Sequence, residues 1–104
     1  MLKEQILSDF LVEIGRIVRS LAGRDKGRYF MICEIKDEEF VFLSDGDYRS
    51  LDNTKLKRLK HLHLTPIVLD NIKEKLELDK KVFDAELRSA IINAGYNSGN
   101  ERRV

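Results

Sequence analysis

The chain has 104 residues, with 19 Lys and Arg against 18 Asp and Glu, so its net charge is close to neutral. This length fits one domain and leaves no room for a large cleft between domains. The near-neutral total hides an uneven distribution, because residues 15–63 carry eleven basic and eight acidic side chains. Basic charge is therefore concentrated in one segment, and such clustering affects association more than the total does.

The single cysteine, Cys33, lies inside an apolar run and cannot form an internal disulfide. No apolar segment approaches the roughly 20 residues that cross a bilayer, and none reads as a secretory signal. We therefore expect a cytoplasmic protein without a membrane partner.

Residues 1–13 form an ambiguous lead-in. Leu2, Ile6 and Phe10 recur at four-residue spacing, which indicates a short amphipathic helix. Residues 10–12 could equally begin a strand. We expect a helical or frayed lead-in.

Short strands are expected between residues 14 and 64. The pattern predicts them at 14–20, 28–35, 40–43, 48–51 and around 62–64. The runs 28–35 and 40–43 are apolar on both faces, which is typical of strands covered on both sides, as in a small closed barrel. Asp45-Gly46 is a pair favoured in tight hairpins. The pattern predicts a mainly β domain, a small barrel or sandwich of about five strands.

The periodicity changes after Leu64, and Pro66 marks a boundary. Helical spacing then predicts a C-terminal helical extension over 65–95, whose better-defined helix runs from Phe83 to Ala94 and is capped by Gly95. Residues 96–104 are polar, and we expect a disordered tail there.

The segment 17–35 organises the rest of the chain. It reads as an apolar run, a loop with two glycines and basic side chains, and a second apolar run. Gly23 and Gly27 bracket Arg24-Asp25-Lys26, and glycine adopts backbone angles that other residues reach only at a cost. We predict a hairpin whose loop presents Arg24 and Lys26 outward.

This segment resembles the KOW motif of ribosomal proteins and transcription elongation factors. More closely, it is similar to bacterial KOW-domain RNA-binding proteins and to the fourteen-e class of large-subunit ribosomal proteins. Gly23 takes the place of the characteristic glycine and Lys26-Gly27 that of the usual Lys-Gly pair, whereas Phe30 stands where many KOW motifs carry glycine. Over residues 14–64 the resemblance implies an SH3-like barrel that binds RNA, ribosomal RNA above all, in translation.

The candidate interface combines basic side chains around the first hairpin with a second basic group after residue 54. Such a cluster can neutralise phosphates, and Tyr48 beside a polar turn is the best candidate to stack on an unpaired base. A solvated, charged surface is the structural alternative. The predicted nucleic-acid-binding residues are Arg16, Arg19, Arg24, Lys26, Arg28, Tyr48, Arg49, Lys55, Lys57, Arg58, Lys60 and His61, with Gly23 and Gly27 shaping the loop.

Other chemistry has little support in the sequence. His61 and His63 would face the same way on a strand, but zinc sites usually need three or four ligands, so we expect no metal or cofactor. The apolar surroundings of Cys33 argue for a buried thiol rather than a nucleophile, and no enzyme signature is present. The alternatives to RNA binding are a protein-interaction module that contacts a ribosomal or transcription protein and, less favoured, a small enzyme. The sequence does not specify the oligomeric state.

Overall fold

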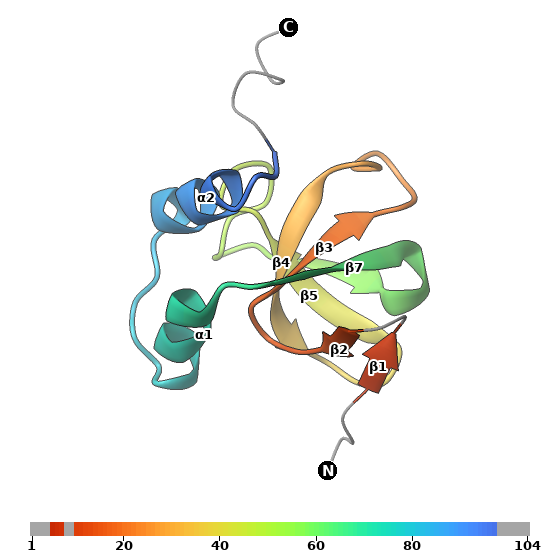
Figure 1. Cartoon of the computed structure of the whole chain (residues 1–104), viewed down its shortest axis with the longest axis horizontal. Coiled ribbons are helices and arrows are strands. Elements are labelled where there is room, and N and C mark those ends of the chain that lie inside the picture. The colour runs from red at the N-terminus through yellow and green to blue at the C-terminus, as the bar shows by residue number, and fades with distance from the viewer. Residues whose placement is uncertain (1–4, 8–9, 98–104) are drawn as a thin grey trace, which may run out of the picture.

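The computed structural model describes residues 5–7 and 10–97. Among these, no helix is long and apolar enough to cross a membrane. In chain order the elements (Figure 1) are β1 (Gln5–Leu7), β2 (Phe10–Val12), β3 (Arg16–Ser20), β4 (Tyr29–Ile35), β5 (Phe40–Ser44), β6 (Lys55–Arg58), the 3-10 helix η1 (Leu59–His61), β7 (Leu62–Val68), α1 (Asp70–Glu77) and α2 (Asp84–Asn93).

Strands β3 to β7 form an antiparallel sheet in the order β6-β5-β4-β3-β7, so β6 and β7 lie at opposite edges. They are nevertheless consecutive in the chain and joined only by the three residues of η1. A 3-10 turn of this length advances about 6 Å. The sheet must therefore curl until its edges approach each other. The prediction of a mainly β, barrel-like domain of about five strands with a helical appendage is confirmed.

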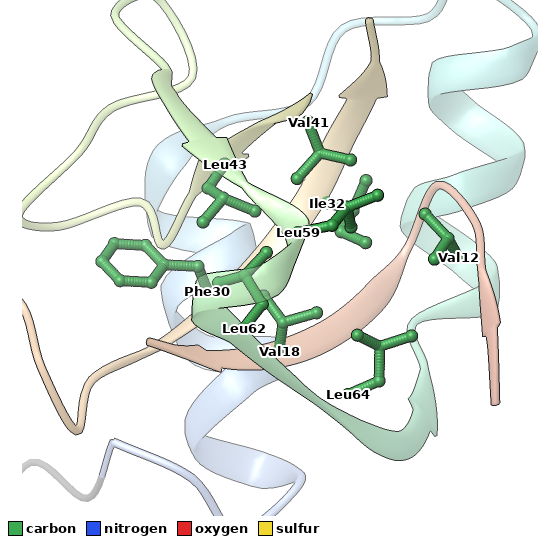
Figure 2. Close-up of a cluster of buried hydrophobic side chains, with 9 residues drawn as sticks. All are labelled: Val12, Val18, Phe30, Ile32, Val41, Leu43, Leu59, Leu62 and Leu64. Atoms are coloured by element: carbon green, nitrogen blue, oxygen red, sulfur yellow. The ribbon is translucent and has the colours of Figure 1, made fainter. Parts of the chain in front are cut away.

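Strand β4 buries both of its faces. On one face, Phe30 and Ile32 belong to a cluster inside the curled sheet, and on the other Met31 packs with Leu87 and Ile91 of α2. The apolar character of residues 28–35 on both faces thus has two causes, the barrel interior and the helical layer. Figure 2 shows the inner cluster of Val12, Val18, Phe30, Ile32, Val41, Leu43, Leu59, Leu62 and Leu64.

The N-terminal lead-in is a small hairpin rather than a helix. Strands β1 and β2 pair antiparallel, with Leu7 opposite Phe10. Val12 is buried in the inner cluster, and β2 lies against β7. This tertiary contact overrides the helical spacing of Leu2, Ile6 and Phe10, of which Leu2 lies outside the described residues.

Residues 48–51, predicted as a strand, lie in the loop between β5 and β6. The backbone N–H groups of Asp47 and Arg49 donate to Asp45 Oδ1 at 3.0 and 2.9 Å. A side chain that satisfies loop amides in this way competes with strand pairing. On the side of β5 away from β4, the pairing strand is β6, whose sequence Lys-Leu-Lys-Arg has a weak strand signal.

Strand β7 passes through the predicted boundary at Pro66 and ends at Val68. Pro66 is exposed on an edge strand, where a missing N–H group costs little. Thr65 Oγ1 donates to the carbonyl of Ile17 at 2.7 Å and ties this part of β7 to β3. The sheet therefore extends beyond residue 64, and α1 follows almost directly.

Helices α1 and α2 cover the outer face of the sheet (Figure 1). The predicted cap Gly95 follows α2 with a φ of +100°. Two residues of the predicted disordered tail are ordered. The rings of Tyr96 and Tyr29 lie 4.4 Å apart, centroid to centroid. Asn97 Nδ2 donates to the Tyr29 carbonyl at 2.6 Å, and Asn97 Oδ1 accepts the Tyr29 N–H at 3.0 Å. The remainder of that tail, residues 98–104, lies outside the described residues.

Gly46→Ala should destabilise the fold more than Gly95→Ala. Both glycines have positive φ, +72° and +100°, a region that costs alanine about 1–2 kcal/mol. A Cβ at Gly46 would also overlap the backbone of Asp84 and Arg88, whereas nothing lies within 4 Å of one at Gly95. In urea unfolding, we expect the free energy of unfolding to fall by about 3 kcal/mol or more for Gly46→Ala and by about 1–2 kcal/mol for Gly95→Ala. Equal losses would contradict close packing between this loop and α2.

Candidate nucleic-acid interface

The loop between β3 and β4, residues 21–28, is a compact turn built on two glycines. Gly23 and Gly27 have φ of +88° and +89°, which side chains with a Cβ rarely adopt. The N–H of Lys26 donates to the Gly23 carbonyl at 3.2 Å, and the N–H of Gly27 donates to the Ser20 carbonyl at 2.8 Å. One hydrogen bond therefore closes the turn itself, and the other ties the loop to the end of β3.

Asp25 connects the loop to the second basic group. Its Oδ1 accepts from Ser20 Oγ at 2.7 Å and from Lys57 Nζ at 3.0 Å, and Lys55 Nζ lies 2.9 Å from Oδ2. Lys57 Nζ also donates to the carbonyl of Ala22 at 2.7 Å. The structure therefore brings Lys55 and Lys57, two members of the second basic group, against the loop of the first hairpin.

Burial alone would raise the pKa of Asp25, but the hydrogen bonds from Ser20, Lys55 and Lys57 outweigh it and lower the pKa to about 2. The carboxylate is therefore ionised at neutral pH and compensates the charge of the two lysines. Lys57, which is buried, acts as a structural cation inside the fold. Lys55 is also engaged by Asp25 and is less available than the sequence suggested.

Four cations remain exposed around this loop: Arg19, Arg24, Lys26 and Lys60. We call them the loop-end cations. The guanidinium of Arg19 reaches Gly27, since a Cβ there would lie 4.0 Å from Arg19 Nη2. The N–H of Leu21 donates to the His61 carbonyl at 2.9 Å and brings η1, with Lys60, against the loop. Within residues 5–7 and 10–97, none of the four cations forms an ion pair.

The two histidines do not share a strand face as predicted. His61 is the last residue of η1 and is half-buried, whereas His63 lies on β7, exposed and directly opposite Arg19. Within the described ranges, no group of three or more His, Cys, Asp or Glu residues could hold a metal ion. His63 was not among the predicted site residues, although its alternation with Leu62 and Leu64 marked it as outward-facing.

Arg16 belongs to the structural framework and not to the loop surface. It is 6% exposed, and its guanidinium donates to the carbonyls of Leu11 and Thr65 at 3.0 and 3.2 Å and to Glu13 Oε2 at 2.9 Å. The side chain of Arg16 is therefore engaged within the fold, which does not favour its predicted contact with a phosphate. Its position at the start of β3 turns the side chain toward β2 and β7, where backbone carbonyls need donors.

Arg28 is also paired within the chain. Its Nε donates to Asp45 Oδ2 at 2.7 Å, its Nη2 lies 3.3 Å from Asp47 Oδ2, and its guanidinium stacks 3.9 Å from the centroid of the Tyr48 ring. Two further predicted site residues have partners on the surface. Arg58 pairs with Glu39 at 3.0 Å, and Arg49 donates to the Asn53 carbonyl at 3.4 Å.

Cys33 packs against the apolar cluster between the sheet and the two helices, and burial raises the pKa of its thiol to about 12. A thiol that stays protonated at neutral pH is a poor nucleophile.

Replacement of Asp25 should lower stability in a pH-dependent way. Because its pKa is depressed in the folded state, its stabilising effect is complete above the unfolded value of about 3.9 and disappears as pH falls through about 2. We expect Asp25→Asn to lower the free energy of unfolding by about 1–3 kcal/mol at pH 6, with a smaller loss at pH 2. Urea unfolding at both pH values tests this, with the exposed Asp52→Asn as control. A pH-independent loss would contradict the ion-pair account.

Comparison with known proteins identifies relatives along most of the chain. No protein-family model matches it. The chain is 37% identical over 84 residues to the large ribosomal subunit protein eL14 of Staphylothermus marinus, covering 81% of this chain and 80% of the relative. It is 29% identical over 93 residues to eL14 of Saccharolobus islandicus strain L.S.2.15, covering 89% and 90%, respectively. The extent and identity of the first match establish that the chain belongs to the eL14 family of large ribosomal subunit proteins.

Proposed function

We propose that the chain binds RNA of the large ribosomal subunit and serves translation without catalysing a reaction. The observation that carries the proposal is the gathering of the loop-end cations around one ordered loop, in a chain whose relatives are large ribosomal subunit proteins. The KOW resemblance of the same hairpin supports it. In this role the protein would work in the cytoplasm.

The mechanism is docking on phosphates. Arg24 and Lys26 extend from the turn, and Arg19 and Lys60 flank it. Each cation that neutralises a phosphate releases a condensed counterion, so affinity falls with salt and depends little on base sequence. Asp25 contributes indirectly, because its bonds to Ser20 and Lys57 fix the loop before RNA arrives. A loop that is already ordered loses less entropy on binding.

Protein docking is the second candidate function. The apolar side chains Leu87 and Ile91 of α2 are buried against the sheet, so this helix face does not favour a partner. Leu78 and Phe83, between the two helices, are 57% and 62% exposed and offer a small apolar contact. A neighbouring ribosomal protein could cover them while the opposite side of the molecule holds RNA.

The double variant Arg24→Gln/Lys26→Gln should bind structured ribosomal RNA fragments more weakly than the wild type. If each side chain neutralises one phosphate, the slope of log affinity against log salt should become shallower by about 1.4–1.8. We expect about a tenfold loss of affinity at 0.1 M salt, measured by fluorescence anisotropy across a salt series.

The matched control is Lys80→Gln/Lys81→Gln, which removes the same charge from two exposed residues in the link between α1 and α2, away from the β3–β4 loop (Figure 1). It should keep the affinity and salt slope close to those of the wild type. Equal losses in both double variants would show that net charge alone matters. Absence of wild-type binding at low salt would refute the RNA proposal for the isolated protein.

A further inference from the structure

Tyr48 is a large aromatic side chain held outside the core. It is 63% exposed, and the guanidinium of Arg28 stacks 3.9 Å from its ring centroid. The hydrophobic clusters of the described residues do not include it. The cation fixes the orientation of a ring that is broadly accessible to solvent.

The cation behind the ring is itself fixed. Asp45 is 1% exposed and accepts the Arg28 Nε–H at 2.7 Å, while Asp47 lies 3.3 Å from Nη2. Asp45 Oδ1 also accepts the backbone N–H groups of Asp47 and Arg49, on either side of Tyr48. One buried carboxylate therefore positions both the guanidinium and the backbone that carries the ring.

Helix α2 holds the rest of this loop. Asp84 Oδ1 accepts the N–H of Leu51 at 2.7 Å, and Arg88 Nη1 donates to the Gly46 carbonyl at 3.3 Å. Gly46 approaches the α2 backbone so closely that a Cβ there would overlap it. In Figure 1 the loop between β5 and β6, coloured yellow-green, lies beside α2. These contacts within the fold order the loop.

We propose that Tyr48 is a stacking platform for an unpaired RNA base, an inference that rests on the proposed RNA function and names the element of RNA recognised. Base stacking on an aromatic ring is favourable for every base and needs an accessible, oriented ring. Asp45 and Asp47 compensate the charge of Arg28, so the platform is suited to a base rather than a phosphate. Arg28 is the last residue of the β3–β4 loop, where Arg24 and Lys26 would hold the backbone of the same RNA.

The test uses two RNA hairpins, one fully paired and one with a single bulged 2-aminopurine nucleotide. Tyr48→Phe keeps the ring, whereas Tyr48→Leu keeps an apolar side chain without one.

We expect Tyr48→Leu to bind the bulged hairpin about tenfold more weakly than the wild type, and Tyr48→Phe to bind it with an affinity within about twofold of the wild type. All three proteins should bind the paired hairpin equally, with the same salt slope. The wild type and Tyr48→Phe should quench 2-aminopurine, and Tyr48→Leu should not. Thermal unfolding checks that all three proteins are folded.

The outcomes separate the two proposals. If the wild type binds both hairpins with salt-sensitive affinity and Tyr48→Leu matches it on the bulged one, stacking is wrong and phosphate docking stands. If Tyr48→Leu weakens binding to both hairpins equally, Tyr48 contributes to general binding and the base-specific inference is overturned. If the wild type binds neither hairpin at low salt, both proposals fail.

Discussion

The burial of both faces of β4 is the constraint on which the rest of this structure depends. Phe30 and Ile32 require a core inside the curled sheet, whereas Met31 requires a second layer outside it. A five-stranded barrel alone would leave the outer side chains in water. Helices α1 and α2 supply that layer, so the C-terminal appendage is part of the hydrophobic core. The free energy gained by burying Leu87 and Ile91 holds α2 in place, and α2 in turn orders the loop between β5 and β6.

Acidic side chains determine which cations can meet a ligand. Asp25 engages Lys55 and Lys57, and Asp45 together with Asp47 engages Arg28. These pairs are wholly or partly shielded from water, where screening is weak and an unpaired charge is costly. The near-neutral net charge is therefore compatible with a local basic surface, because Asp25, Asp45 and Asp47 are engaged within the fold. The loop-end cations are what remains exposed beside the β3–β4 loop.

Two loops from different parts of the chain are stabilised by the same device. In each, an aspartate of the loop accepts a hydrogen bond from a cation: Asp25 from Lys57, and Asp45 from Arg28. Each also accepts a second set of hydrogen bonds from nearby groups, Asp25 from Ser20 Oγ and Asp45 from two backbone N–H groups of its own loop. Arg28 is the last residue of the β3–β4 loop, and its side chain bonds Asp45 and Asp47 in the loop between β5 and β6. This side chain therefore links the loop of the proposed phosphate contacts to the loop of the proposed stacking platform. Ordered loops lose less entropy when they bind, which suits the proposed docking role.

Local structure could be predicted from the sequence where residues adjacent in the chain determine it. The glycine-bracketed hairpin at 23–27, the doubly apolar strand 28–35 and the glycine cap after α2 follow from backbone angles and periodicity. Other features could not be predicted from the sequence, because they depend on partners far away in the chain. They are the packing of the N-terminal hairpin on β7, the extension of β7 through Pro66, and the roles of Arg16 and Lys57. A basic side chain looks the same in a sequence whether it faces water or a buried carboxylate. Only tertiary structure brings Asp25 to Lys57 and the Thr65 carbonyl to Arg16, and thereby decides which cations remain available at the surface.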